Sequence, residues 1–394
     1  MPRTILHIDL DAFFCAVEET QNPELRGRAF AVGGKPDERG VVASCSYAAR
    51  RMGVRSAMPM AKALRLSPGL IIVSSRHHLY REVSRQVMKL LHELTALLEQ
   101  ISIDEAFLDI SDIHEEPETI ARNLQTRIRD ELQLPCSIGI ASNKLVAKIA
   151  TEVGKSLSLR NTQSRGEIAP PNALTVVPFG GEAAFLSTLP ADMLWGVGPK
   201  TSARLTELGI HTMGDIAKWP DSELIRMFGE NGRDLARHSK GIDERPIVTE
   251  RETKSISQEI TFSRDVRDDN ILQKTVQEMS AEVGAQLRRN NLAGKTIKLK
   301  LRWPDFRTLT RQTTFSHPTD QEDEIAKAAL ELLKSVRKPN QAVRLIGVGV
   351  SGLGQPIRQL GLWDIEDEES RKLQEAVDDL REKFGKNVVQ RKEK

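Results

Sequence analysis

Cysteine and long apolar segments are both scarce in this sequence, and each absence excludes a class of protein. The three cysteines, Cys15, Cys45 and Cys136, are widely spaced and form no Cys-x-x-Cys pair. This excludes a disulfide framework and a cysteine-based zinc site, and it fits a reducing, cytoplasmic location. No apolar run approaches the ~20 residues that cross a bilayer. Asp9 and Asp11 interrupt the only apolar stretch near the N-terminus, so we expect neither a membrane span nor a signal peptide.

An excess of one charge is also missing from the chain as a whole, although the charge is unevenly distributed. The 394 residues carry a formal net charge of +2, so total charge does not indicate a nucleic-acid-binding protein. Between residues 254 and 356, however, 17 Lys or Arg stand against 12 Asp or Glu. A locally basic module of this kind fits binding to a phosphate backbone. A solvated basic face without a ligand is the alternative.

Apolar periodicity predicts an α/β organisation with at least two modules. The pattern indicates strands over 4–10, 101–103, 106–110 and 137–140, and helices over 79–98, 120–132 and 142–150. This order is that of a ferredoxin-like split β-α-β sheet. The pattern then predicts a polar surface loop over 156–172, a helical stretch over 179–245, a tether over 250–257, a second α/β module from 258, and a charged tail over 364–394.

Acidic residues follow two apolar strands of the first predicted sheet. Asp9 ends the first strand, and Asp104 and Glu105 lie at a turn about ninety residues later. Adjacent carboxylates near apolar strands repel each other and are poorly solvated, so a cation between them is favourable. Mg²⁺ prefers such oxygen ligands together with substrate phosphates, which makes phosphoryl transfer the leading chemistry. The backbone carbonyl of Leu10 is a further candidate ligand. The alternative is that Asp104 and Glu105 are ordinary turn residues.

Three other clusters suit phosphate or partner binding. Tyr47 and Arg50 share one helix face, and a phenol and a guanidinium both bind phosphate oxygens. The Gly-Val-Gly-Pro-Lys segment over 196–200 fits a helix–hairpin–helix better than a dinucleotide fingerprint, because Pro199 follows the second glycine. The Gln-Leu-Gly-Leu-Trp segment over 359–363 is suited to an apolar pocket on a partner, although packing on the chain's own core is equally open.

Four segments taken together resemble a known family. They are HIDLDAFFCAVE over 7–18, the stretch 44–54, SIDEAFLD over 102–109 and SIGIASNK over 137–144. They are similar, in collinear order, to the motifs of Y-family translesion DNA polymerases of the DinB branch. The resemblance extends from residue 4 to residue 363.

The resemblance implies a right-hand polymerase of the α/β (α+β) class, with a ferredoxin-like palm, small fingers, a helical thumb with a helix–hairpin–helix, and an α/β little finger. The expected boundaries are palm 1–12 and 76–176, fingers 13–75, thumb 177–246, linker 247–257, little finger 258–356, and clamp-binding peptide with charged tail 357–394. The implied activity is template-directed addition of deoxynucleotides to a primer 3′ end, with low fidelity and no proofreading. Primer–template DNA, deoxynucleoside triphosphates and a sliding clamp are the implied partners of a monomeric chain.

The resemblance also implies roles for individual residues. Asp9, Asp104 and Glu105, with the Leu10 carbonyl, are expected to hold two Mg²⁺ ions, with Mn²⁺ as an alternative. Phe13, Phe14, Tyr47, Arg50 and Lys155 are expected to bind the nucleotide, with Phe14 as the steric gate against ribose. Simple core packing beside Phe13 is the alternative for Phe14. DNA contacts are expected from Gly196, Gly198, Lys200, Arg288, Arg289, Lys298 and Lys300, and clamp contacts from Gln359, Leu360, Leu362 and Trp363.

The sequence departs from the family pattern at two places. Lys155 is followed by Ser-Leu-Ser and a polar segment instead of Pro-Asn-Gly, which affects the position of Lys155. About thirty residues, many of them charged, follow the clamp-like peptide, which usually ends the chain. Two rival functions are a palm-fold nucleotidyl enzyme of the cyclase type and a non-catalytic DNA-binding protein. The basic module and the hairpin argue against the first, and the intact carboxylate set argues against the second.

Overall fold

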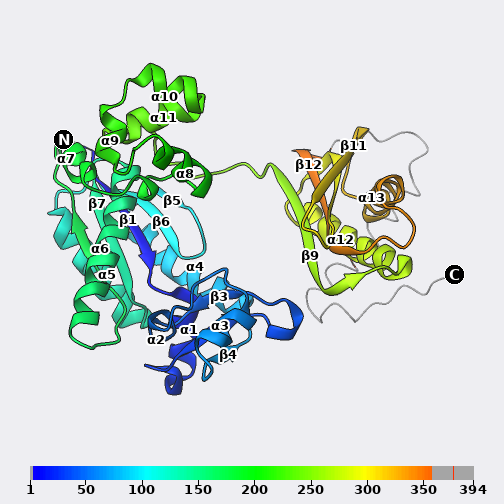
Figure 1. Cartoon of the computed structure of the whole chain (residues 1–394), viewed down its shortest axis with the longest axis horizontal. Helices are drawn as coiled ribbons and strands as arrows, with labels where there is room; N and C mark the ends of the chain where they lie inside the picture. Colours follow the sequence, from blue (N-terminus) through cyan, green and yellow to red (C-terminus); the bar gives the residue numbers. More distant parts are fainter. Residues whose placement is uncertain (1–2, 357–375, 377–394) are drawn as a thin grey trace. The chain divides into compact units, whose positions relative to one another are not determined.

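A computed structural model describes residues 3–356 and residue 376 of the chain (Figure 1). The chain divides into two units, residues 1–251 and residues 252–394. None of the helices in the described part is both long enough and apolar enough to span a bilayer.

The first unit is built on a five-stranded sheet with the order β5-β6-β1-β7-β8. Its strands are β1 (Ile5–Leu10), β5 (Leu98–Gln100), β6 (Glu105–Asp109), β7 (Cys136–Ala141) and β8 (Leu174–Val176). β1 lies in the middle and pairs antiparallel with both β6 and β7. Most of its residues are buried, as expected for a strand whose two faces are both covered. The sheet therefore has the predicted ferredoxin-like arrangement.

Helices cover both faces of this sheet (Figure 1). One core lies between the sheet and the helices α1 (Phe13–Gln21), α4 (His77–Leu94) and α5 (Pro117–Leu132). The other core lies between the sheet and α6 (Lys144–Ser164). A Cβ on Gly139 of β7 would lie 2.1 Å from the Ala147 carbonyl oxygen of α6, so the glycine permits this close crossing. The close crossing brings the far half of α6 over the C-terminal end of β1.

A smaller sheet and two short helices lie in the segment between α1 and α4. The sheet has the order β3-β2-β4, and its elements are β2 (Phe30–Gly33), β3 (Val42–Cys45), α2 (Tyr47–Arg51), α3 (Met60–Leu66) and β4 (Ile71–Val73). The Ser46 hydroxyl caps α2 by accepting a hydrogen bond from the Ala49 amide, 3.2 Å away. This cap fixes where α2 begins, and so which residues of α2 point toward the large sheet.

The remaining part of the first unit is helical, as predicted for 179–245. Its helices are α7 (Glu182–Ser187), α8 (Pro199–Glu207), α9 (Met213–Lys218), α10 (Asp221–Phe228) and α11 (Glu230–His238). The turn before α8 needs glycine at Gly196, where φ is +99°. Gly198 is the N-cap of α8, and Pro199 occupies its first position, where a missing N–H costs nothing.

The second unit is a four-stranded antiparallel sheet with two helices on one face. Its elements are β9 (Ser255–Val266), α12 (Asp269–Arg289), β10 (Ala293–Arg302), β11 (Thr308–Thr319), α13 (Glu322–Val336) and β12 (Val343–Gly354), with the sheet order β11-β10-β12-β9. Ile297, Leu299 and Leu301 of β10 pack in the core with α12 and α13. Lys298 and Lys300 alternate with them, so both side chains lie on the open face of the sheet.

Three predicted element boundaries were wrong. Residues 156–172 were predicted as a loop, but α6 continues to Ser164 because neither glycine nor proline lies between Lys155 and Ser164. Asn143, and not Ser142, caps this helix. The strand predicted over 101–103 lies instead at Leu98–Gln100, and 101–104 form a turn in which Ser102 hydrogen-bonds Asp104.

A buried carboxylate joins α6 to the end of the first unit, and its removal is expected to destabilise this unit. Glu99 is 1 % exposed and accepts hydrogen bonds from Lys144 Nζ (2.8 Å), the Val248 amide (3.0 Å) and Arg251 (2.5 Å). Burial alone raises the pKa of Glu99, but these donors outweigh it and hold the pKa below its usual value. Glu99→Gln leaves the Lys144 ammonium buried without its counter-charge, so we expect it to lower the free energy of unfolding by about 3 kcal/mol at pH 7.

The difference in the free energy of unfolding between the wild type and Glu99→Gln should become smaller as pH falls. Because the folded-state pKa is depressed, the stabilising contribution of Glu99 is complete above its unfolded pKa near 4.3 and is lost as pH falls through the folded value. Urea denaturation of both proteins between pH 7 and pH 3.5 measures this loss. Glu93→Gln, at an exposed carboxylate paired with Arg127, is the matched control and should change stability by less than ~1 kcal/mol. An equal effect of the two substitutions would contradict the account.

Candidate active site

The sheet brings the acidic residues to one edge. Asp9 and Glu105 are directly opposite each other in the β1–β6 ladder, and the Leu10 amide donates to the Asp104 carbonyl oxygen at 2.9 Å. The turn before β6 therefore lies beside the C-terminal end of β1. Backbone pairing alone places all three carboxylate-bearing residues at the same end of the sheet.

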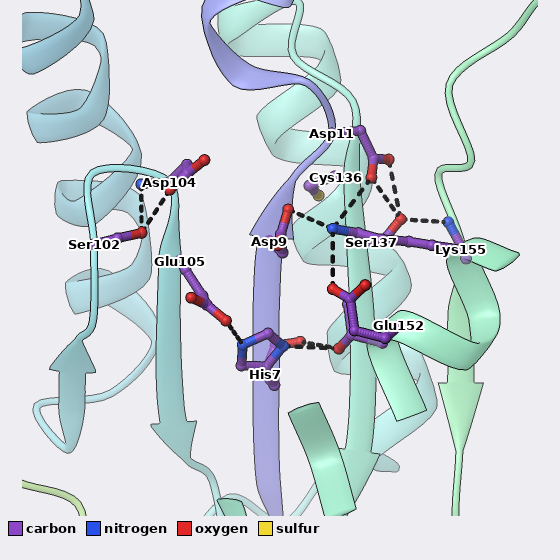
Figure 2. A network of polar contacts seen from close by, with 12 residues as sticks. His7, Asp9, Asp11, Ser102, Asp104, Glu105, Cys136, Ser137, Glu152 and Lys155 are labelled. Carbon is purple, nitrogen blue, oxygen red and sulfur yellow. Dashed lines mark hydrogen bonds and ion pairs between the residues drawn. The ribbon is translucent and has the colours of Figure 1, made fainter. Parts of the chain in front are cut away.

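Each carboxylate has a polar partner in this structure (Figure 2). Asp9 Oδ1 lies 2.5 Å from Lys155 Nζ, and Asp104 accepts a hydrogen bond from the Ser102 hydroxyl at 2.5 Å. Glu105 is ion-paired with Lys148 and lies 2.6 Å from His7 Nε2. A carboxylate only accepts hydrogen bonds, so Nε2–H of His7 donates to Glu105.

Burial and like charge dominate the electrostatics of this edge. Burial raises the pKa of Asp104, and the neighbouring Asp9 charge adds to the rise. Burial alone would lower the pKa of Lys155, but the charges of Asp9, Glu152 and Asp11 outweigh it and raise the pKa. The Lys155 ammonium therefore stays charged beside the carboxylates. The site holds more negative charge than it can solvate, which favours additional cations.

Asp11 is buried behind the edge and anchors the chain around it. Its carboxylate accepts hydrogen bonds from the Ser137 hydroxyl (2.9 Å) and the Asn172 amide (2.9 Å). Burial raises its pKa to about 6, although the nearby Lys155 charge opposes the rise. Ala12, the next residue, has φ +49°, a left-handed turn that directs the chain from β1 into α1. Asp11 thus fixes the turn that presents the following aromatic residues.

The donor chemistry of the edge fits hard divalent cations. Carboxylate and carbonyl oxygens are the ligands that Mg²⁺ and Mn²⁺ take in proteins. Within residues 3–356 and residue 376, no three His, Cys, Asp or Glu side chains are arranged to hold a metal ion. Glu105 is instead turned toward His7 and Lys148. Metal binding at this edge therefore requires the carboxylates to exchange their present partners for the ion.

A cavity of about 480 Å³ opens directly in front of the acidic edge. Asp9, Leu10 and Asp104 from the acidic edge line this cavity, and so do Tyr47 and Arg50 of α2. Other lining residues include Phe13, Phe14, Glu152, Lys155, Ser156, Leu159 and Pro171. The structure thus brings the predicted metal carboxylates and the predicted phosphate-binding residues to one cavity. Glu105 stands behind its wall.

The side chains of α2 are oriented by contact with each other and with the end of β3. The Arg50 guanidinium lies 5.0 Å from the centre of the Tyr47 ring, and its Nε donates to the Cys45 carbonyl oxygen at 3.2 Å. One of the five guanidinium N–H groups is used in this way, and the planar fork stays beside the cavity. Burial raises the pKa of the Tyr47 hydroxyl, which therefore remains a proton donor. Both groups suit phosphate oxygens.

Phe14 also lines the cavity, and its ring is held by other side chains. It stacks on Tyr80 with ring centres 4.2 Å apart and an angle of 14° between the planes. The Tyr80 hydroxyl donates to Glu18 Oε1 at 2.6 Å, and Glu18 is also paired with Arg76. These contacts leave the Phe14 ring little freedom to move away from a ligand.

Other predicted site residues lie elsewhere in the fold. Gly196, Gly198 and Lys200 lie at the exposed start of α8, and Lys298 and Lys300 lie on the open face of the second sheet. Arg289 is exposed at the end of α12, whereas the Arg288 side chain is only 6 % exposed and donates to the Asp320 carbonyl oxygen. The candidate clamp residues 359–363 and the charged tail lie outside the described residues.

Sequence reasoning named Lys155 but missed three other polar side chains near the carboxylates, His7, Lys148 and Glu152. Lys148, Glu152 and Lys155 are spaced four and three residues apart, so they share one face of α6. The spacing is visible in the sequence, but the predicted helix ends at Ala150 and so leaves Glu152 and Lys155 outside it. His7 precedes Asp9 by two residues and so lies on the same side of β1.

Comparison with known proteins is consistent with this geometry. Residues 8–152 match the impB/mucB/samB family, and residues 253–362 match its C-terminal domain. The chain is 39 % identical to the DNA polymerase IV of Desulfatibacillum aliphaticivorans, over 98 % of this chain and 95 % of the relative. It is 44 % identical to that of Streptomyces coelicolor, over 89 % of this chain and 71 % of the relative.

The chain belongs to the DNA polymerase IV family. It is a translesion DNA-directed DNA polymerase, and neither rival function is favoured. Its fold is similar to a Y-family DNA polymerase chimera, Dbh-Dpo4(243-245)-Dbh, with a TM-score of 0.78 and 26 % identity over 89 % of this chain and 99 % of the chimera. It is also similar to DinB from Sulfolobus solfataricus, with a TM-score of 0.59 and 28 % identity over 88 % and 98 % of the two chains. The polymerase thus has the right-hand architecture expected of it, and its family uses divalent metal ions.

Proposed function

We propose that the 480 Å³ cavity is the site where this polymerase binds the incoming deoxynucleoside triphosphate. The observation that supports this most directly is that Asp9 and Asp104 line the same cavity as Tyr47 and Arg50. Asp9, Asp104 and Glu105, with the Leu10 carbonyl, would hold two divalent cations, Mg²⁺ or alternatively Mn²⁺. When bound, these ions lower the pKa of the primer hydroxyl and stabilise charge on the leaving diphosphate.

The chain's own residues have distinct tasks in this proposal. Tyr47 and Arg50 donate hydrogen bonds to the phosphate oxygens and fix the triphosphate against the acidic edge. Lys155 is charged and pairs with Asp9 in this structure. If Asp9 held a cation, the Lys155 ammonium would be released from Asp9 and could donate to a phosphate oxygen. Phe13 and Phe14 form the wall beside the sugar, and the Phe14 ring excludes a ribose 2′-OH.

A test of this site is the affinity for nucleotide in single-turnover insertion. Arg50→Ala removes a charged donor from the triphosphate wall, so we expect the apparent Kd for the nucleotide to rise about tenfold or more. Arg65→Ala removes the same charge from an exposed position on α3 and serves as the control. An unchanged apparent Kd in Arg50→Ala would show that the triphosphate binds elsewhere.

We further propose that three parts of the chain bind the DNA backbone. They are Lys298 and Lys300 on the open face of the second sheet, Arg289 at the end of α12, and the α8 turn at Gly196, Gly198 and Lys200. Arg288 is excluded from this surface because its guanidinium is buried. Lys298→Ala should weaken primer–template binding for all sequences and reduce the slope of log Kd against log salt by about 1. Lys327→Ala, exposed on α13 at the other face of the sheet, should leave the slope unchanged. Equal slopes for the wild type and Lys298→Ala would remove this lysine from the interface.

The proposed partners also include a sliding clamp, bound by Gln359, Leu360, Leu362 and Trp363, and we propose that the polymerase acts as a monomer. The proposed boundaries are palm 1–12 and 76–176, fingers 13–75, thumb 177–246, linker 247–257 and little finger 258–356. The division into units at Arg251 is compatible with a linker there.

A further inference from the structure

The segment 156–172, here called the strap, is attached to the acidic edge at both ends. It begins as the last turns of α6, directly after Lys155, whose Nζ lies 2.5 Å from Asp9. It ends at Asn172, whose amide donates to the buried Asp11 carboxylate at 2.9 Å. Within it, the Ser158 hydroxyl donates to the Pro171 carbonyl oxygen at 2.7 Å. The strap is therefore a folded part of the site and not a free loop.

Three strap residues line the nucleotide cavity. Ser156, Leu159 and Pro171 lie beside Lys155 on its wall. The strap thus lines the same cavity as Tyr47, Arg50 and Lys155. The strap begins at the residues after Lys155 where the sequence departs from the family pattern.

A residue of α2, Arg51, is hydrogen-bonded to the strap. Arg51 Nη1 donates to the Gly166 carbonyl oxygen at 3.2 Å, and Nη2 donates to the Glu167 carbonyl oxygen. Arg51 is next to Arg50 in the chain but does not line the nucleotide cavity. Its fork therefore joins α2 to the strap without occupying the space that the triphosphate would need.

Little else fills the space between α2 and the strap. A second cavity of about 150 Å³ lies there, lined by Arg51, Arg55, Thr162, Gln163 and Glu167 among others. Tyr47, Arg50 and Leu159 line both cavities. A helix of five residues has almost no stability of its own, so its orientation depends on contacts such as these.

We propose that Arg51 is a positioning residue for nucleotide binding. By holding the strap, it keeps Tyr47 and Arg50 at the distance from Lys155 at which all three bind one triphosphate. The proposal rests on the proposed function of the cavity. It predicts that Arg51 contributes to nucleotide affinity without touching the nucleotide, and that this contribution is transmitted through the backbone carbonyls of Gly166 and Glu167.

Single-turnover insertion separates this role from a structural one. Arg51→Ala should raise the apparent Kd for the nucleotide about tenfold while the maximal insertion rate and the Kd for primer–template change less than about twofold. Arg51→Lys places one donor near the strap and should recover part of the affinity. Arg65→Ala controls for the loss of positive charge from the fingers, and the thermal midpoint of each variant controls for folding.

A double-mutant cycle tests the route through the strap. Gly166 has φ +76°, and a Cβ there meets no atom within 4 Å, so Gly166→Ala displaces the carbonyl through backbone strain alone. Gly166→Ala should raise the apparent Kd in the same direction as Arg51→Ala. The double variant should be no weaker than Arg51→Ala, because the same contact is already lost.

The outcomes distinguish this proposal from that of the cavity. If Arg51→Ala keeps the wild-type Kd while Arg50→Ala raises it, the positioning role is wrong and the nucleotide site stands. Multiplicative effects of Arg51→Ala and Gly166→Ala would also overturn the role, because they would show independent actions. If neither Arg50→Ala nor Arg51→Ala changes the Kd, the cavity itself is not the nucleotide site.

Discussion

Replacing Asp104 by asparagine is expected to lower the rate of nucleotide insertion by about a thousandfold or more. The substitution keeps the shape of the side chain but removes a charge that lies at the acidic edge of the cavity beside Asp9. If this carboxylate holds a divalent cation, its loss removes several kcal/mol of transition-state stabilisation. Primer extension with Mg²⁺, measured under single-turnover conditions, gives the rate constant directly.

The same substitution should not weaken the fold. Asp104 is half-buried and repelled by Asp9, so an uncharged side chain at this position is at least as favourable for stability. The matched control is Asp112→Asn, at an exposed position in the loop after β6, which should extend primers like the wild type. A fully active Asp104→Asn protein would refute the metal role of this carboxylate.

Replacing Phe14 by alanine is expected to raise the ratio of ribonucleotide to deoxynucleotide insertion by about a hundredfold. The ring stacks on Tyr80 at 4.2 Å, and the hydroxyl of Tyr80 is hydrogen-bonded to the buried Glu18. A ring supported in this way cannot yield to an additional hydroxyl group on the sugar. Its removal opens space for the 2′-OH while the deoxynucleotide keeps its other contacts.

Competition between labelled ribo- and deoxynucleotides at one template position measures this ratio. Phe14→Tyr keeps the ring and the stack, so it should select sugars nearly as the wild type does. If Phe14→Ala discriminates against ribonucleotides as strongly as Phe14→Tyr, then Phe14 is only a packing residue beside Phe13.

The acidic edge was predictable from the sequence because it depends on backbone pairing. An apolar strand that ends in Asp9 and a turn that carries Asp104 and Glu105 indicate neighbouring strand ends once both strands belong to one sheet. The ladder places Asp9 opposite Glu105, as this reasoning requires. The same holds for α2, where the spacing of Tyr47 and Arg50 predicts that both side chains share one side of the helix.

The contacts that orient these groups were not predictable in this way. The polar composition after Lys155 resembled a loop, yet helix α6 continues to Ser164, because no glycine or proline interrupts it there although none of these residues is buried. Arg51 and Gly166 are 115 residues apart, and no local pattern relates an arginine to a distant backbone carbonyl. The support of Phe14 by Tyr80 likewise depends on how α4 packs on α1, which single-sequence patterns do not specify.

The most direct measurement is a crystal structure of the polymerase with primer–template DNA, an unreactive deoxynucleoside triphosphate and Mn²⁺, whose anomalous scattering locates the ions. The account predicts Mn²⁺ between the carboxylates of Asp9 and Asp104 and phosphate oxygens on Tyr47 and Arg50. Metal and triphosphate bound elsewhere, with Asp9 still paired to Lys155 and Glu105 to His7, would contradict it.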